Sequence, residues 1–399
     1  MKRYSEYKDS GVKWIGEIPG HWKIVRLKFV TENLDYLREP ISAELRERKN
    51  PQYDYYGASG IIDKIDHYNV DDKVLLIGED GANLLMRNLP LVYRAEGKFW
   101  VNNHAHILKT RLNDYSFFAH LLESQDYTLF VTGTAQPKLS QFNLGNVPLP
   151  ISPINEQKIM GKYLDSKVAK IDEYISIAEK KIAALEELKQ TIIAEAVTRG
   201  IHKDVPMKDS GVKWIGMIPE HWDCCKLKYF TRIKSGDALT NNALSDTGKY
   251  KVYGGGDFMG FYDKYNVDAN TILIGRVGAR CGCVTITEEK AWATDNALIL
   301  IHFNINTKFL TYLLVAANLN SLSISNAQPL ITGSKVKDSF IPEQQEIVSY
   351  LDSKVANINQ LCQAERSQIE KLKEYKQRLI SDVVTGKVKV TNDSLNGRV

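Results

Sequence analysis

The sequence of 399 residues lacks the features that define several protein classes. No apolar run approaches the roughly 20 residues that a bilayer-spanning helix needs. The start, MKRYSEYKDSG, is charged and lacks the apolar segment of a secretory signal. The five cysteines are odd in number and irregularly spaced, which argues against a disulfide-built secreted fold. We therefore expect a cytoplasmic protein with no membrane segment.

The motifs of DNA-modifying and nucleotide-driven enzymes are also missing. An amino-methyltransferase carries an Asn/Asp-Pro-Pro-Tyr/Phe tetrapeptide, and the chain contains none. A nucleotide-driven motor needs a GxxxxGK[ST] phosphate loop, and neither SDTGKY at 245–250 nor YGGGDF at 253–258 has that arrangement. Glu288-Glu289-Lys290 imitates half of a nuclease motif but has no upstream Pro-Asp partner. The sequence predicts a chain without a catalytic centre of its own.

The bulk composition is that of an ordinary globular protein with two or three domains. Hydrophobic residues make up 43% of the chain and charged residues 25%, which supplies apolar material for more than one core. The formal net charge of +4 and the pI of about 8.5 permit nucleic-acid binding. They do not establish it, because dedicated nucleic-acid-binding domains often have a pI above about 9.

An internal duplication organises the chain, and missing such a repeat would misassign the whole fold. KDSGVKWIGEIPGHW at 8–22 returns as KDSGVKWIGMIPEHW at 208–222 with two of fifteen positions changed. YLDSKVA at 163–169 is identical to 350–356. Shorter matches join YNVD at 68–71 to 265–268, Trp100 to Trp292, and AQP at 135–137 to 327–329. The offset falls from 200 to 187, so deletions have accumulated in the second copy.

Identity is unevenly distributed between the two copies. It is high at the edges of each copy and low in the interiors, near residues 30–150 and 230–335. Old duplication followed by drift is the simplest explanation. We favour a functional interpretation, in which the two edges meet common partners while the two interiors have diverged to recognise different things.

Each interior combines short strands, glycine turns and helices. VLLIGEDGA at 74–82 and TILIGRVGA at 271–279 are typical of a strand followed by a tight turn, and ALILIHF at 297–303 is typical of another strand. Helices are expected over 115–130 and 307–318. This pattern predicts an α+β fold with a mostly antiparallel sheet.

Each interior ends in a proline, Pro153 or Pro342, which suits the first position of a helix. Long helices are expected over about 166–198 and 353–385, with spacings of three and four that predict a coiled-coil seam. The seam positions are Ile171, Ile175, Ala178, Ile182, Leu185, Ile192 and Ala196, matched by Ile358, Cys362, Glu365, Ile369, Leu372, Leu379 and Val383. A helix of about 33 residues is roughly 50 Å long, which exceeds one turn of B-DNA, roughly 34–36 Å. Two such helices, most simply antiparallel, would hold two domains on one face of a duplex with a gap between their contacts.

Both copies place a lysine, Lys189 or Lys376, at the same inward seam position. A polar seam residue can fix the register of two helices. Lysine stems can equally pass a loose seam and carry the ammonium group to solvent. The sequence leaves both interpretations open.

These features together closely resemble the specificity (S) subunit of type I restriction–modification enzymes. The resemblance rests on the KDSGVKWIGEIPGHW repeat, the AQP segments, the stretches PINEQKIMGKYLDSKVAKID and PEQQEIVSYLDSKVANIN, and the two seam helices. It covers essentially the whole chain. The corresponding division is a first target recognition domain with its N-terminal edge over 1–153, a central helical spacer over 154–200, a second target recognition domain over 201–340, and a distal helical spacer with a polar tail over 341–399.

The resemblance implies two α/β target recognition domains related by internal duplication, joined and spaced by two long antiparallel coiled-coil helices. Each domain would read one half of an asymmetric, gapped sequence in double-stranded DNA. The helices would set the gap and dock two methyltransferase subunits, and two motor-endonuclease subunits would complete the restriction complex. S-adenosylmethionine, ATP and magnesium would bind those other subunits, so no cofactor is expected in this chain.

Candidate base-reading residues are polar side chains that differ between the copies within matching segments. Base edges are read by Arg and Lys on guanine, by Asn and Gln on adenine, and by acidic groups on cytosine. The candidates are Arg276 and Arg280, opposite Glu79 and Asn83, and Asn102, Asn103 and His104, opposite Thr294, Asp295 and Asn296. For each of them a solvated turn residue is the alternative.

Polar residues shared by both copies indicate a common role, either a backbone contact or fold geometry, and we favour geometry. They are Tyr56, Tyr253, Gln136 and Gln328. Candidate phosphate contacts lie just beyond the AQP segments, at Lys138, Lys335 and Lys337. The tryptophans of the repeated edge are expected to pack against the helices or a partner subunit, namely Trp14, Trp22, Trp214 and Trp222.

No metal site is expected. Cys224-Cys225 and Cys281-x-Cys283 supply four thiols but not the usual CxxC spacing of structural zinc. Their counterparts in the first copy are apolar, namely Ile24, Val25, Leu84 and Met86. Cysteine acting as a small buried hydrophobe explains this better than a ligand does. His104 and His106 are likewise matched by Asn296 and Leu298.

Two other functions compete with DNA recognition. A scaffold whose lobes bind two copies of one protein is disfavoured by the divergent interiors, because identical partners should keep both lobes alike. A self-contained nuclease is disfavoured by the missing motifs.

Overall fold

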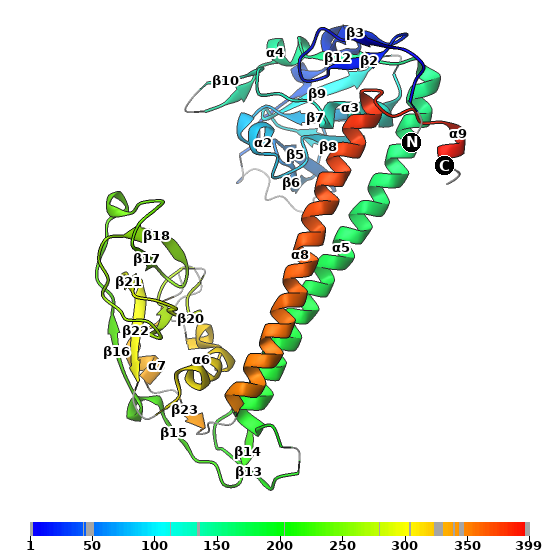
Figure 1. Cartoon of the computed structure of the whole chain (residues 1–399). Coiled ribbons are helices and arrows are strands. Elements are labelled where there is room, and N and C mark those ends of the chain that lie inside the picture. The colour runs from blue at the N-terminus through cyan, green and yellow to red at the C-terminus, as the bar shows by residue number, and fades with distance from the viewer. Residues whose placement is uncertain are drawn as a thin grey trace. The chain divides into compact units, whose positions relative to one another are not determined.

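The computed structural model describes residues 3–42, 44, 52–111, 113–133, 136–202, 204–278, 280–302, 305–322, 330–337, 340–342 and 347–395. The chain forms two compact units (Figure 1), which we call unit 1 (Met1–Ala178 with Ser367–Val399) and unit 2 (Glu179–Arg366). Both boundaries fall inside long helices, so each unit holds part of α5 (Ile154–Arg199) and part of α8 (Ile347–Val384).

Unit 1 is built on a six-stranded sheet in which every neighbouring pair is antiparallel except β5 and β8. In sheet order the strands are β4 (Thr31–Asn33), β9 (Ala105–Thr110), β7 (Val70–Gly78), β8 (Val92–Val101), β5 (Tyr53–Gly57) and β6 (Gly60–Ile65). Short pairs surround the sheet: β1 (Tyr7–Asp9) with β2 (Glu17–Pro19), β3 (Lys23–Arg26) with β12 (Pro148–Ile151), and β10 (Val131–Thr132) with β11 (Lys138–Leu139). The helices are α2 (Gly81–Met86), α3 (Tyr115–Glu123), α4 (Gln141–Gly145) and α9 (Asn392–Leu395), with 3-10 turns η1 (Leu27–Phe29) and η2 (Asp35–Leu37).

The apolar run of β7 is buried on both faces because each face meets its own core. Side chains alternate across a strand. Leu75 and Ile77 therefore pack into the core that contains α3, whereas Val74 and Leu76 pack into a second core on the other face of the sheet. The helix α3 begins where the Asp114 carboxylate accepts a hydrogen bond from the Phe117 amide. It ends at Glu123, earlier than the expected 130.

Unit 2 repeats this plan with shorter strands and two separate sheets. One sheet has the order β16 (Thr231–Ser235), β22 (Ala297–His302), β19 (Ile272–Gly275) and β20 (Val284–Ile286), and the other β18 (Phe258–Tyr262), β17 (Tyr250–Tyr253) and β21 (Ala291–Ala293). The remaining elements are β13 (Met207–Asp209), β14 (Met217–Pro219), β15 (Cys224–Lys226), η3 (Leu227–Tyr229), η4 (Asn241–Ala243), α6 (Thr307–Ala316), η5 (Leu319–Leu322), α7 (Gly333–Lys337) and β23 (Phe340–Pro342). The expected α+β fold with mostly antiparallel sheets is confirmed in both units.

The expectation that Pro342 opens a helix is wrong. Pro342 lies in β23 and pairs with Cys224 of β15, just as Pro150 pairs with Ile24 in unit 1. Its structural counterpart is therefore Pro150. Pro153 directly precedes α5, and its carbonyl accepts the first hydrogen bonds of that helix.

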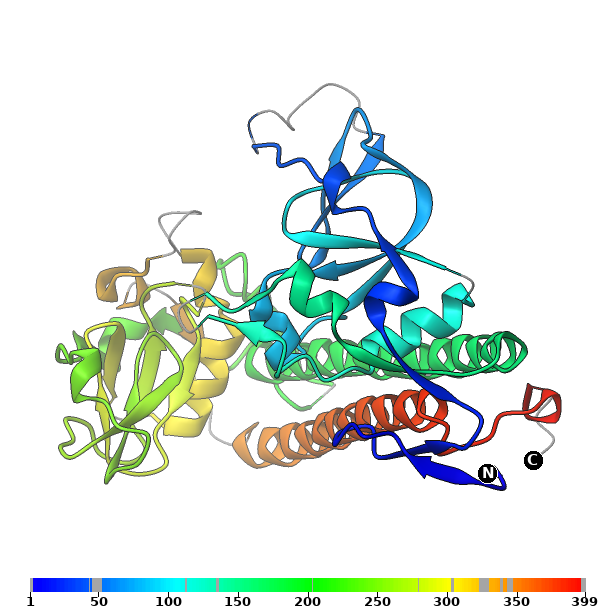
Figure 2. The same cartoon turned by 90° about the horizontal axis from the view of Figure 1, so that it is seen from above.

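The long helices run side by side (Figures 1 and 2) and are antiparallel within each unit. In unit 2 Lys181 donates to Glu365 and Lys189 donates to Asn359 at 3.2 Å, so residue numbers rise on α5 as they fall on α8. In unit 1 Lys376 of α8 donates to Asp172 of α5 at 2.6 Å. The predicted seam is confirmed, since its positions are buried or half-buried. Both helices begin earlier than expected, α5 with 46 residues and α8 with 38.

The repeated tryptophan segments pack on helix ends within their own units. Trp22 shares a core with Val383 at the end of α8, and Trp222 shares one with Val197 at the end of α5. The packing expected for these two tryptophans is therefore confirmed. It also gives a physical reason for the near-identity of 8–22 and 208–222, because both segments cover equivalent helix ends.

Candidate nucleic-acid interface

Three loops of unit 1 meet where the turn after β5, the end of β7 and the connection from β8 to β9 come together. We call residues 57–60, 78–81 and 102–104 together loop edge 1. The Asn102 amide donates to the Tyr56 carbonyl at 3.0 Å, and the Glu79 amide donates to the His104 carbonyl at 2.8 Å. A Cβ on Gly78 would lie 2.6 Å from the Ala58 carbonyl oxygen. Only glycine therefore lets the β5–β6 turn approach the end of β7.

Unit 2 builds the same junction from the matching residues. Loop edge 2 consists of residues 254–257, 275–278 and 294–296. The Thr294 amide donates to the Tyr253 carbonyl at 2.9 Å, and the Arg276 amide donates to the Asn296 carbonyl at 3.0 Å. A Cβ on Gly275 would collide with the Gly255 carbonyl oxygen, as at the equivalent glycine of unit 1.

A fourth segment closes each edge in the same way. The Leu139 amide donates to the Glu79 carbonyl, and the Ile331 amide donates to the Arg276 carbonyl, both at 2.9 Å. These bonds confirm that Arg276 is the counterpart of Glu79. The backbone is thus conserved between the two edges, while the side chains that it presents differ in charge.

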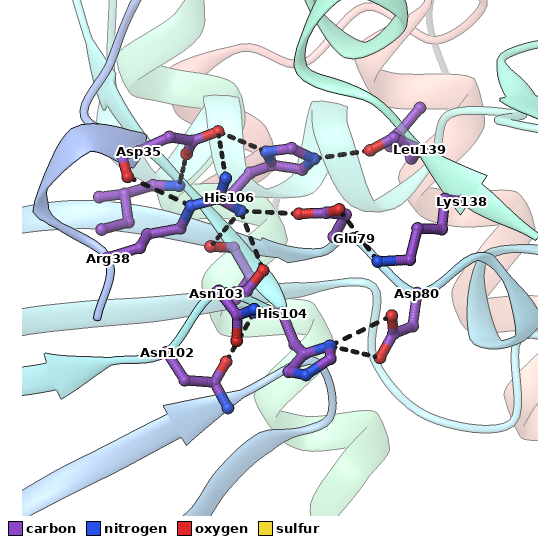
Figure 3. A network of polar contacts seen from close by, with 12 residues as sticks. Asp35, Arg38, Glu79, Asp80, Asn102, Asn103, His104, His106, Lys138 and Leu139 are labelled. Atoms are coloured by element: carbon purple, nitrogen blue, oxygen red, sulfur yellow. Dashed lines mark hydrogen bonds and ion pairs between the residues drawn. The ribbon is translucent and has the colours of Figure 1, made fainter. Parts of the chain in front are cut away.

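In loop edge 1 the carboxylate of Glu79 is held by two cations (Figure 3). Arg38 from the end of η2 donates to Glu79 at 2.8 Å, and Lys138 lies 3.4 Å from its other oxygen. Burial raises the pKa of Glu79, but the hydrogen bond and charge of Arg38, with His106 and Lys138, lower it more, so the net pKa lies below the usual value. His104 lies beside Asp80 at 3.1 Å.

Behind loop edge 1, His106 is buried and bonded at both ring nitrogens. Its Nδ1 lies 2.6 Å from the Asp35 carboxylate, and its Nε2 lies 2.7 Å from the Leu139 carbonyl oxygen (Figure 3). Burial raises the pKa of Asp35, but the hydrogen bonds from His106 and the Ile107 amide together with the charge of Arg38 outweigh it, and the net pKa is lowered. These contacts tie η2, which Arg38 directly follows, to β9 and β11.

Loop edge 2 carries a guanidinium where loop edge 1 carries a carboxylate. Arg276 donates to Ser235 Oγ at 3.4 Å, and among the described residues it has no carboxylate partner. Its Nε is buried and finds no acceptor within the described part of the chain. The Cys281 thiol donates to the Arg276 carbonyl at 3.2 Å and so supports the turn. Burial raises the pKa of that thiol.

The other base-reading candidates take several environments. Asn103 and Asn296 are exposed at the loop edges, whereas Asn102 is buried and its Oδ1 accepts the His104 amide at 2.8 Å. The Asn83 amide group is engaged by the backbone of Leu89 and Pro90.

Arg280 is exposed and paired with Asp257 at 3.0 Å. Its assignment as the counterpart of Asn83 is wrong, because Asn83 lies in α2 whereas Arg280 lies in a turn. Pairing of β7 with β8 and of β19 with β20 places Val92 opposite Ile77 and Val284 opposite Ile274, so five fewer residues connect the strands in unit 2. For the same reason Leu84 and Met86 are not the counterparts of Cys281 and Cys283.

Shared residues serve the backbone frame of the edges. The Tyr56 and Tyr253 carbonyls accept the equivalent hydrogen bonds described above, and the Tyr56 ring packs edge-on against Phe99. Gln136 is exposed beside Pro137, and Gln328 lies outside the described residues. Lys138 is on β11, whereas Lys335 and Lys337 are on α7, so the three lysines do not occupy one equivalent position.

Two residues of the edges were not found from the sequence. Arg38 lies in a stretch without a matching motif, and Ser235 occupies the position that Asp35 takes in unit 1. Arg38 contacts Glu79, and Ser235 contacts Arg276, and the two partners in each contact are 41 residues apart in the sequence. No local pattern announces such contacts.

Within the described residues, no group of three or more His, Cys, Asp or Glu side chains is placed to hold a metal ion. The described helices likewise include none with the length and apolar character to cross a bilayer.

Comparison with known proteins identifies the family. The family model described as the type I restriction modification DNA specificity domain matches residues 19–187 and 219–371, more than half of the chain. A type I restriction enzyme specificity subunit of Methanocaldococcus jannaschii is 23% identical over 97% of this chain and 98% of that protein. A Haemophilus influenzae protein that bears the name of such a subunit is 34% identical over 154 residues, which cover 38% of each chain.

A solved structure has the same fold, with a TM-score of 0.63 and 17% identity over 93% of this chain and 99% of that chain. Its description is the structural basis underlying complex assembly and conformational transition of the type I R-M system. The two family matches fall on the two copies of the repeat, and each contains one complete loop edge. The chain therefore belongs to the type I restriction–modification DNA specificity family.

Proposed function

We propose that each unit reads one half of a bipartite, gapped DNA site, and that the chain delivers partner enzymes to this site without a catalytic centre of its own. The observation that carries this proposal is the pair of loop edges. Their backbones are held by the same hydrogen bonds, yet their polar side chains differ. A scaffold for two identical protein partners has no need of such divergence, whereas two different half-sites require it.

In unit 2 the principal base reader is Arg276. A guanidinium without a carboxylate partner among the described residues retains donors for guanine O6 and N7. Asn296 belongs to the same loop edge, and Arg280 lies beside that edge. In unit 1 Asn103 and His104 are exposed and take the equivalent role, while Asn102 positions His104 through its side-chain oxygen.

Lysines near each loop edge contact phosphates. Lys335 is exposed on α7, and Lys337 is half-buried on the same helix. Lys138 lies 3.4 Å from Glu79, and its side chain is exposed at loop edge 1. Such contacts position the protein on the duplex without reading sequence. Tyr56, Tyr253 and Gln136 maintain the edge geometry, and Asn83 maintains the loop after α2.

The long helices set the gap between half-sites and dock two methyltransferase subunits, with two motor-endonuclease subunits completing the complex. The helix α5 continues through 46 residues, about 69 Å at 1.5 Å per residue. We take the domain boundaries as 1–153, 154–200, 201–340 and 341–399. S-adenosylmethionine, ATP and magnesium belong to the partner subunits, and the complex acts on DNA in the cytoplasm.

A methylation map of DNA from cells that carry all the subunits tests this function. We expect adenine methylation at one two-part motif with an unspecified gap of several bases. Replacing residues 30–150 with another recognition domain should change one half of the motif only. A change in both halves, or in neither, would show that the assignment of one unit to each half is wrong.

Two substitutions at Arg276 separate base reading from phosphate binding. Arg276→Lys keeps the positive charge but loses the planar fork that guanine engages. We expect both Arg276→Lys and Arg276→Ala to relax recognition in one half-site, at a cost of about 1–3 kcal/mol. If Arg276→Lys kept full specificity while Arg276→Ala weakened binding to all sequences alike, Arg276 would be a phosphate contact. An unchanged motif and affinity in Arg276→Ala would remove it from the interface.

A further inference from the structure

Both units carry two exposed apolar side chains at the hairpin that forms part of the loop edge. In unit 1 they are Ile61 and Ile62 of β6, with exposed fractions of 54% and 51%. In unit 2 they are Phe258 and Met259 of β18, with 51% and 45%. A single exposed apolar side chain is ordinary on a protein surface. An adjacent pair at the equivalent place of both copies calls for an explanation.

The strand register shows that the two pairs are equivalent. Ile61 pairs with Tyr56 across the hairpin of unit 1, and Phe258 pairs with Tyr253 across the hairpin of unit 2. In both hairpins the register shifts just before that tyrosine. Such an irregularity bends a strand and re-aims its side chains, and it recurs beside functional sites.

One member of each pair is fixed over a glycine. A Cβ on Gly57 would lie 2.8 Å from Ile62 Cδ1, and a Cβ on Gly254 would collide with Met259 Sδ. Ile62 and Met259 therefore close over the hairpin backbone. In unit 2 the other member, Phe258, packs edge-on against Phe261, with ring centroids 5.2 Å apart.

The apolar pairs adjoin the polar residues of the same edges. The Cβ position of Gly57 is 3.4 Å from Asn102 Nδ2, and that of Gly255 is 3.6 Å from the Asn296 carbonyl oxygen. We propose that each hairpin pair contacts the apolar parts of DNA bases in its half-site, which rests on the DNA-reading function proposed above. The apolar surface is either a thymine methyl group in the major groove or the face of a base at an opened step.

The chemistry of the pairs favours DNA over a protein partner. Unit 1 presents two aliphatic side chains, and unit 2 presents an aromatic ring and a thioether. Docking two copies of one subunit would favour the same side chains in both places. Two half-sites of different sequence would not, and the polar side chains of the loop edges diverge in the same way.

The test uses the full chain in complex with its methyltransferase subunits. Affinity for the mapped site and for a scrambled duplex is measured for Ile61→Ser with Ile62→Ser, and separately for Phe258→Ser with Met259→Ser. Phe29→Ser and Tyr229→Ser are matched controls, because these exposed side chains lie at the opposite end of β9 and β22 from the loop edges. Each double variant should bind the mapped site about tenfold more weakly, and each control should bind as wild type does.

Two DNA arms distinguish the apolar surfaces. Replacing thymine by deoxyuridine in one half-site should weaken the wild type but not the matching double variant if the methyl group is the contact. A 2-aminopurine probe should brighten on binding of the wild type but not of the variant if a base is unstacked. Where a double variant loses folded structure, Ile61→Ser alone carries the test, because it leaves Ile62 in place over Gly57.

Three results would overturn the inference. Double variants that bind the mapped site with wild-type affinity, and that respond to deoxyuridine and to 2-aminopurine as the wild type does, would place the hairpins away from the bases. Loss of the methyltransferase subunits with unchanged DNA affinity would assign the hairpins to protein docking. A wild-type complex that does not distinguish its site from the scrambled duplex would overturn the proposed function, and the inference with it.

Discussion

Replacing His106 by leucine places in unit 1 the side chain that unit 2 has at the equivalent position, Leu298. In unit 1 this position forms the buried pair with Asp35, and the two side chains are 1% and 6% exposed. In unit 2 Leu298 pairs with Ser235 in the strand register, so neither charged partner is present. The two copies thus show two solutions for one site behind the loop edge.

The structure sets the expected magnitude. Removing one partner of a buried ion pair costs about 3–5 kcal/mol, because the other charge stays buried without compensation. In His106→Leu, Asp35 keeps its contacts with the Ile107 amide at 2.8 Å and with Arg38 at 3.5 Å. We therefore expect the free energy of unfolding to fall by about 3 kcal/mol, the lower end of that range. For a unit of this size that lowers the melting temperature by about 6–12 °C. The double variant Asp35→Ser with His106→Leu should recover at least about 1 kcal/mol, because neither partner remains alone.

Thermal unfolding and hydrogen exchange at the Ile107 amide, which reports on unit 1, measure these effects. The pH dependence gives a second readout. Since the pKa of folded Asp35 lies below its unfolded value of about 3.9, its contribution is present above that pH and is lost as the pH falls through the folded pKa. The double variant should lose less stability on acidification. A His106→Leu chain as stable as wild type, or a double variant less stable than His106→Leu, would refute this reasoning.

Two further predictions concern the edge backbone and the helix seam. Gly275→Ala should displace the β17–β18 turn and lower the free energy of unfolding by about 1–3 kcal/mol. Gly145→Ala is the control and should be tolerated, because its Cβ would make only a 3.4 Å contact with Lys28. Equal melting temperatures for the two variants would contradict the close approach at Gly275. Lys376→Leu removes a partly exposed ion pair with Asp172 and should change the free energy of unfolding, measured in urea, by less than about 1 kcal/mol. A larger loss, together with altered pairing of the helices, would show that this lysine fixes their register.

Much of the fold was accessible from the sequence because the determining interactions are local. The seam of α5 and α8 follows from residues three and four apart, and the strand at 74–77 follows from an apolar run next to glycine. The repeat added the correspondence of Arg276 with Glu79, which the backbone hydrogen bonds confirm. It failed between 79 and 92, where the second copy is shorter and an alignment without gaps pairs the wrong residues.

The arrangement of each edge depends on contacts between residues far apart in the chain. Arg38 reaches Glu79 over 41 residues and His106 reaches Asp35 over 71, and neither pair follows a helical or strand period. Pro342 likewise lies in a strand because β15, more than 100 residues earlier, offers it an edge. The sequence specified which side chains differ between the copies through its repeat. Folding determined which of them meet, because strand pairing and close glycine contacts bring loops together that are far apart in the sequence.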